Sequence, residues 1–254
     1  MEQPPVTRKR PRGIYLLPNL FTTAALFAGF YGVLAATQGR FEASSIAIFA
    51  AMLLDGFDGR VARMTHTQTA FGAEYDSLSD MVAFGVAPAL IAYHWALHGL
   101  GKLGWLAAFV YCAAAALRLA RFNTQLGSAD KRFFQGLPSP SAAAVVAGGV
   151  WIGADQGIDP SYVSWLVAAL TAGTGLLMVS NFRYFSFKQL DLQGRVPFVL
   201  AVVVMLVIAL ILIQPPIVLF LGFLGYAISG PVWTLMSLRD RRASRRRARP
   251  DGGG

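Results

Sequence analysis

The sequence predicts an all-α fold, a polytopic integral membrane bundle of about eight transmembrane helices with both termini cytoplasmic. Three observations lead to this prediction. The 254 residues are 55% hydrophobic and only 14% charged, with a mean hydropathy of +0.52, which is more apolar than a soluble domain. Apolar segments of about 20 residues, the length that crosses a bilayer, recur along the chain. Their apolar residues are continuous rather than alternating, which favours helices over a barrel.

The polar stretches are short, so a single membrane domain over residues 19–236 is predicted. A basic segment, 1–18, precedes the first span, which is interpreted as a retained helix because removing it would spoil the charge pattern of the later loops. A basic tail, 237–254, follows and is expected to lie in solvent or against lipid headgroups. In chain order, the predicted spans are residues 19–37, 43–63, 71–97, 103–121, 139–156, 161–182, 196–213 and 217–236.

Basic residues fix the expected orientation, because cytoplasmic loops are richer in Lys and Arg. With the N-terminus inside, the outside loops receive only Arg40 and Lys102. The net charge of +9 lies beside apolar spans, so it indicates contact with membrane lipids and no nucleic acid. The basic residues of the inside loops are Arg60, Arg63, Arg121, Lys131, Arg132, Arg183, Lys188 and Arg195.

An acidic stretch, residues 53–80, interrupts this apolar pattern. Asp55 and Asp58 lie near the cytoplasmic end of the second span, and Asp76 and Asp80 near the start of the third. Spacings of three and four residues place each pair on one helix face. Four nearby carboxylates need a compensating charge, and hard oxygen ligands without His or Cys suit Mg²⁺, Mn²⁺ or Ca²⁺. The pattern therefore predicts a divalent-metal site, with two ions clamping a phosphoryl group.

Small and basic residues in the same stretch suit a phosphate-bearing ligand. Gly56, Gly59, Ala62 and Gly72 remove side-chain bulk, and Arg63 offers a guanidinium fork to phosphate oxygens. Two simpler interpretations stay open: the glycines serve helix packing, and Arg63 anchors the loop at the membrane surface.

The order and spacing of these residues resemble the signature of the CDP-alcohol phosphotransferase family. The resemblance implies a membrane enzyme, usually a homodimer, that transfers a substituted phosphate from a CDP-linked donor to an alcohol and releases CMP, with a divalent metal. It implies metal ligands at Asp55, Asp58, Asp76 and Asp80, with Asp80 also the general base. The nucleotide-binding positions that it implies are Gly59, Ala62, Arg63 and Gly72.

Four further stretches resemble the bacterial and archaeal membrane-type phosphatidylserine synthases within this family. This resemblance covers roughly the first 150 residues and implies CDP-diacylglycerol as donor and L-serine as acceptor, at the cytoplasmic face of a prokaryotic cell membrane. The stretches are "LPNLFT" (17–22), "SDMVAFGVAPA" (79–89), "LRLARFN" (117–123) and "FQGLPSPSAAA" (134–144).

Polar residues near these stretches are candidates for substrate contact. Arg118, Arg121 and Lys131 gather donors that a serine carboxylate needs, and Asn123 adds a hydrogen-bonding amide. Lys131 facing lipid headgroups remains an alternative. At the start of the first span, Asn19 and Thr22 are expected to bind the nucleotide or to cap the helix.

Two competing functions stay open from the sequence. A related enzyme with a glycerol phosphate or inositol phosphate acceptor would use the same basic residues. A proton or cation transporter also keeps acids within its spans, but here the acids gather at one rim with no continuing ionisable path.

Overall fold

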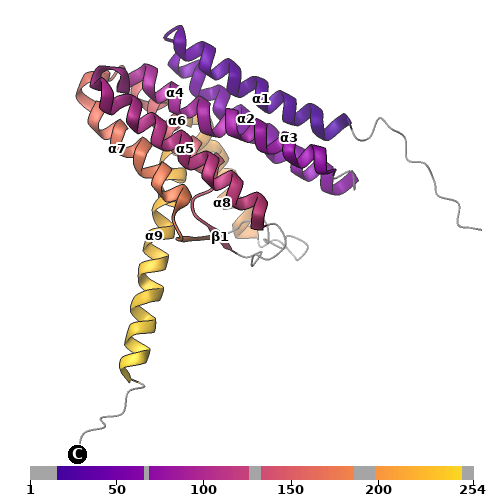
Figure 1. Ribbon diagram of the computed structural model, residues 1–254, viewed down its shortest axis with the longest axis vertical. Coiled ribbons are helices and arrows are strands. Elements are labelled where there is room, and N and C mark those ends of the chain that lie inside the picture. The colour runs from indigo at the N-terminus through magenta and orange to yellow at the C-terminus, as the bar shows by residue number, and fades with distance from the viewer. Residues whose placement is uncertain (1–15, 66–68, 126–132, 186–197, 248–254) are drawn as a thin grey trace, which may run out of the picture.

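The computed structural model describes residues 16–65, 69–125, 133–185 and 198–247, and these are almost entirely helical (Figure 1). Each apolar segment predicted from the sequence overlaps a helix of the described chain, which confirms a mostly helical fold. Two short strands, β1 (Phe133–Gln135) and β2 (Arg183–Phe185), pair antiparallel. The α-helices are α1 (Leu16–Thr37), α2 (Phe41–Thr65), α3 (Ala70–Asp80), α4 (Ala87–Ala92), α5 (Lys102–Gln125), α6 (Ser139–Asp155), α7 (Pro160–Val179), α8 (Phe198–Ile213) and α9 (Pro215–Arg247).

Five helical segments of the described chain are long and apolar enough to cross a membrane. Of the other predicted spans, α2 carries charged residues through its second half, and α6 and α8 have 17 and 16 residues. The count of eight therefore stays a prediction. The five segments are Asn19–Thr37, Ala70–Leu100, Lys102–Thr124, Pro160–Val179 and Pro215–Met236.

The third predicted span is one helical rod whose backbone changes register twice. After α3, the chain continues as a π-helix, η2 (Met81–Val86), then α4, then a second π-helix, η3 (Tyr93–Leu97), and a 3₁₀ turn, η4 (His98–Leu100). Single π-turns inside helices are rare and often occur at functional sites. The first of them begins directly after Asp80.

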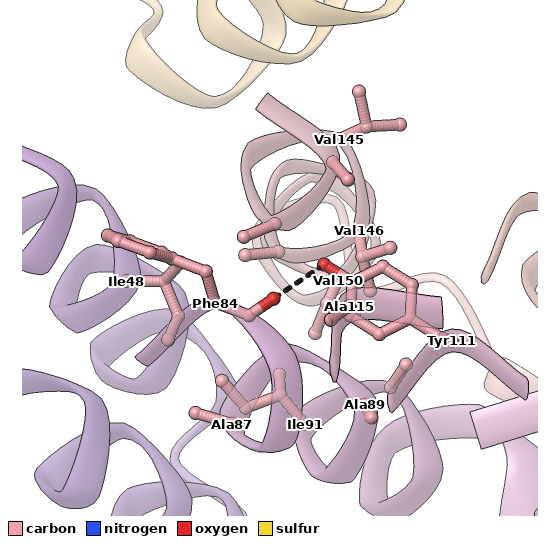
Figure 2. Packing of buried hydrophobic residues seen from close by; sticks show 14 of the residues in the cluster. Ile48, Phe84, Ala87, Ala89, Ile91, Tyr111, Ala115, Val145, Val146 and Val150 are labelled. Carbon is pink, nitrogen blue, oxygen red and sulfur yellow. Dashed lines mark hydrogen bonds between the residues drawn. The ribbon is translucent and has the colours of Figure 1, made fainter. Parts of the chain in front are cut away.

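This rod is the most buried of the five long apolar segments, and its residues pack within the cluster drawn in Figure 2. Phe84, Ala87 and Ile91 have no exposed surface, and they pack among small residues that let helices approach closely. At Gly29 on α1, an added Cβ would lie 2.7 Å from the Cα of Ala83, so only glycine permits this crossing. The rod is therefore fixed against its neighbours just beyond its acidic end.

The buried Tyr111 hydroxyl on α5 also holds the rod in place. It donates a hydrogen bond of 2.9 Å to the carbonyl of Phe84 within η2 (Figure 2). A buried carbonyl needs such a partner, particularly where the regular ladder is interrupted. Tyr111 thus stabilises the π-turn next to Asp80.

Helix α9 leaves the bundle at the end where the strand pair lies (Figure 1). The Tyr184 hydroxyl donates to the carbonyl of Ala227, and the Arg183 amide donates to Oγ1 of Thr234. The apolar sequence stops near 236, yet the helix continues to Arg247. The continuation is rich in arginine with some alanine, both good helix formers, so loss of hydrophobicity does not end the helix.

Candidate active site

Three of the predicted aspartates come together where α2 meets α3. Asp55, Asp76 and Asp80 each offer a carboxylate oxygen, and these oxygens lie within 4.8 Å of one another. All three side chains are half-buried. Asp76 and Asp80 are one turn apart on α3, so they share the face that α2 approaches. The meeting of two acidic helix faces is therefore confirmed for these three residues.

The fourth aspartate, Asp58, is more deeply buried and has a different partner. Only 6% of its surface is exposed, and its Oδ2 accepts a hydrogen bond of 2.8 Å from the Thr22 hydroxyl on α1. Asp58 lies outside the group of three that meets the 4.8 Å distance within the described chain. The motif thus divides into a converging trio and a carboxylate tied to α1.

The start of α3 places two predicted nucleotide-binding residues side by side. Thr69 caps this helix, since its side chain accepts a hydrogen bond of 3.0 Å from the amide of Gly72. A Cβ added at Gly72 would lie 3.6 Å from Oδ1 of Asn19. Asn19 on α1 and Gly72 on α3 therefore border the same space.

On α2, the glycines of the motif leave their side of the helix open. A Cβ added at Gly56 or Gly59 would meet no described heavy atom within 4 Å. Helix packing against described residues therefore does not explain either glycine. Helix α2 includes Ala62 and Arg63, but their side chains lie outside the described part of the molecule.

Arg118 lies half-buried on α5 and interacts electrostatically with Asp80. Its Nη1 donates a hydrogen bond of 2.7 Å to Oγ of Ser139, the first residue of α6. Its buried Nε meets no acceptor among the described atoms. Ser139 was not singled out from the sequence, although it stands in the "GLPSP" stretch of the resemblance. No local pattern pairs residues 21 positions apart.

The other predicted acceptor-binding residues have structural partners. Nη2 of Arg121 donates to Oε1 of Gln135 in β1 at 2.6 Å and to Oδ1 of Asn181, between α7 and β2, at 2.7 Å. These two bonds hold α5 against both segments. Asn123 donates to the Ser77 hydroxyl on α3 at 3.0 Å. Lys131 lies outside the described residues.

The chemistry of the trio fits a divalent cation. Three carboxylates carry −3 and the neighbouring Arg118 carries +1, which leaves −2 in a half-buried site. One Mg²⁺, Mn²⁺ or Ca²⁺ ion would balance this charge, and all three prefer such oxygen ligands. Within the described chain, Asp55, Asp76 and Asp80 are the residues whose carboxylates lie close enough together to hold it.

Comparisons with known proteins identify the family of this chain. A family model described as CDP-alcohol phosphatidyltransferase matches residues 15–179, more than half of the chain. A protein of Helicobacter pylori named CDP-diacylglycerol--serine O-phosphatidyltransferase is 34% identical over 229 residues, which cover 89% of this chain and 94% of the relative.

Two further relatives carry the same name. The Mycobacterium leprae protein is 30% identical over 223 residues, 86% of this chain and 74% of its own length. The Bacillus subtilis protein is 31% identical over 173 residues, 68% of this chain and 92% of its own length. The family expected from the aspartate motif is therefore confirmed, and this chain belongs to the CDP-alcohol phosphatidyltransferase family.

Proposed function

We propose that this protein transfers the phosphatidyl group of CDP-diacylglycerol to the hydroxyl of L-serine, giving phosphatidylserine and CMP. The observation that carries the proposal is the convergence of Asp55, Asp76 and Asp80 within the region that matches the family. The names of the relatives that align over most of this chain support serine as the acceptor. Membership of a transferase family favours an enzyme over the transporter alternative.

In the proposed reaction, the serine oxygen attacks the phosphorus that carries diacylglycerol. A new P–O bond to serine forms, the P–O bond to CMP breaks, and a carboxylate oxygen of Asp80 accepts the hydroxyl proton. Asp55, Asp58, Asp76 and Asp80 would hold divalent metal, Mg²⁺ or Mn²⁺, which offsets negative charge on the reacting phosphates. Arg118 adds a fixed positive charge beside Asp80.

The nucleotide of the donor fits the open side of α2. Gly56 and Gly59 leave backbone uncovered there, so phosphate oxygens could come close to the helix. We propose that Asn19 and Gly72 border the cytidine and that Ala62 and Arg63, one helical turn beyond Gly59, complete the phosphate contacts.

Arg118 and Arg121 are equivalent candidates for acceptor binding from the sequence, but their hydrogen bonds in the structure differ. The Arg121 guanidinium is held by Gln135 and Asn181. Arg118 has an Nε without an acceptor in the described structure and lies beside the general base. We propose that Arg118 binds the serine carboxylate and that Arg121 braces the site, with Asn123 and Lys131 as further candidate contacts.

Replacing Arg118 by alanine should raise the KM for serine about tenfold to a hundredfold, the loss typical of a charge-assisted hydrogen bond. The KM for CDP-diacylglycerol should change much less. Steady-state CMP release at varied serine checks this, with Arg121→Ala as the matched arginine control whose serine KM stays near normal. An unchanged serine KM in Arg118→Ala would remove this residue from the acceptor site.

The reaction itself is tested with purified protein, CDP-diacylglycerol and Mn²⁺. Serine, ethanolamine, glycerol phosphate and inositol phosphate are offered in turn, CMP release is measured, and the lipid product is identified by mass spectrometry. Serine-dependent CMP release with phosphatidylserine as product supports the proposal. Faster turnover with either phosphate-bearing alcohol would identify the related enzyme, and equal use of ethanolamine would argue against carboxylate recognition.

We further propose that the protein is a homodimer in a prokaryotic cell membrane and that each chain crosses the membrane eight times. The active site and both termini are proposed to face the cytoplasm. The supporting observation is a chain of contacts at one end of the bundle. Asn123 near the end of α5 bonds to Ser77, which lies next to Asp76; Arg121 bonds to β1; and β2 bonds to Thr234 on α9, ahead of its arginine-rich end. Positive charge marks the cytoplasmic side of a membrane protein. Crosslinking in native membranes would test the homodimer.

Cysteine labelling tests the orientation. In a Cys112→Ala background, Thr124→Cys at the active-site end should resist an impermeant maleimide added outside intact cells. Gln156→Cys, exposed after α6 at the opposite end, should react. Labelling of Thr124→Cys alone would invert the proposed topology.

A further inference from the structure

Thr22 joins α1 to both halves of the aspartate motif. Its hydroxyl donates the 2.8 Å hydrogen bond to Oδ2 of Asp58 on α2, and its carbonyl accepts one of 3.1 Å from the Ser79 hydroxyl on α3. Thr22, Asp58 and Ser79 are 4%, 6% and 3% exposed. Two buried hydrogen bonds to two different helices therefore meet at one residue.

The bond to Asp58 restricts how that carboxylate can turn. With Oδ2 engaged by the Thr22 hydroxyl and the Gly59 backbone as a further hydrogen-bond partner, rotation of the carboxylate about the Cβ–Cγ bond is limited. Carboxylates that bind metal are commonly oriented by such hydrogen bonds, and removing the supporting group weakens metal binding.

The bond from Ser79 extends this effect to α3. Ser79 directly precedes Asp80, so fixing its hydroxyl on the Thr22 carbonyl fixes the start of the rod relative to α1. The neighbouring Thr23 makes different contacts, since its hydroxyl donates to the carbonyl of Asn19 and pairs with the Tyr75 hydroxyl. Of these two adjacent threonines on α1, Thr22 therefore donates to an aspartate of the motif, whereas Thr23 contacts Asn19 and Tyr75. Thr23 can therefore serve as a control for Thr22.

We propose that Thr22 is a positioning residue for the metal site, one that orients Asp58 toward the cation. Its hydroxyl donates to Asp58, so we assign Thr22 a role that acts through a metal ligand, beside the nucleotide contact predicted from the sequence. This inference rests on the proposed function only in taking Asp58 as a metal ligand.

The test is to measure Mn²⁺ binding to the detergent-purified full chain, without substrates, by electron paramagnetic resonance. Thr22→Val keeps the shape of the side chain and removes the donor, so the Kd for Mn²⁺ should rise about tenfold to a hundredfold. Thr22→Ser keeps the donor and should bind within a few-fold of the unaltered protein. Thr23→Val, the matched control, should leave the Kd unchanged.

CMP release at increasing Mn²⁺ gives the second measurement. Thr22→Val should need more Mn²⁺ but approach normal kcat at saturation, with an unchanged KM for CDP-diacylglycerol. In an Asp58→Asn background, Thr22→Val should weaken Mn²⁺ binding little further, because the group that it orients is already altered. Thr22→Ala provides the same comparison if the valine variant does not fold.

Three results would overturn the inference. They are an unaltered Mn²⁺ Kd in Thr22→Val, an equal loss in Thr23→Val, and a change confined to the KM for CDP-diacylglycerol. Failure of the proposed function looks different, since the unaltered protein would then show no serine-dependent CMP release while Mn²⁺ binding could still be compared among the variants.

Discussion

Asp80→Asn should lower kcat for CMP release by about 10²- to 10⁴-fold, the contribution typical of a general base. Asparagine keeps the size of the side chain and one oxygen in the acidic trio, but it cannot accept the serine proton at neutral pH. CDP-diacylglycerol should still bind, so the loss falls largely on kcat. Steady-state kinetics, together with donor binding measured separately, checks this expectation.

A matched control for Asp80→Asn is available at the other end of the bundle. Asp159 is an exposed aspartate that caps α7 through a 2.9 Å hydrogen bond from the Ser161 amide, remote from the acidic trio. Asp159→Asn should leave kcat unchanged. Full turnover by Asp80→Asn would show that another group takes the proton.

Asp55→Asn should also remove most turnover, by at least about 100-fold, but for a different reason. The trio loses one of its three carboxylates, so it balances a divalent cation less well, and charge stabilisation by a metal is worth several kcal/mol. Mn²⁺ binding should weaken in parallel while the protein remains folded in detergent.

Activity measured at increasing Mn²⁺ concentration distinguishes Asp55→Asn from Asp80→Asn. Activity of Asp55→Asn should recover in part at high Mn²⁺, whereas that of Asp80→Asn should not, because added metal does not supply a proton acceptor. Normal activity and normal Mn²⁺ binding in Asp55→Asn would contradict the metal-site assignment.

The sequence predicted the helices and the convergence of three aspartates because both depend on local patterns. Runs of apolar residues mark each helix, and spacings of three and four residues place Asp76 and Asp80 on one face. The pairing of Asp58 with Thr22, 36 residues apart, follows instead from how α1 packs on α2. Sequence periodicity contains no such information.

The same limit applies to the arginines of α5. Arg118 and Arg121 have identical chemistry and lie one turn apart, so the sequence assigned both to the acceptor. Only their contacts, with Ser139 in one case and with Gln135 and Asn181 in the other, distinguish them. The π-turns were not predicted either, since a continuous apolar run looks the same in either helical register.

Those π-turns determine how the rod would tolerate insertions and deletions. The amide of Ala87 donates to the carbonyl of Val82, and that of His98 to Tyr93, each five residues back rather than four. A π-turn holds one residue more than the α-turn that it replaces, so after deletion of one residue within η2 the chain can close to a regular α-turn and keep the acidic end facing as it does now. A single-residue deletion in the regular turns of α3 has no extra residue to take up and would rotate the residues before it by roughly 100° relative to those after it.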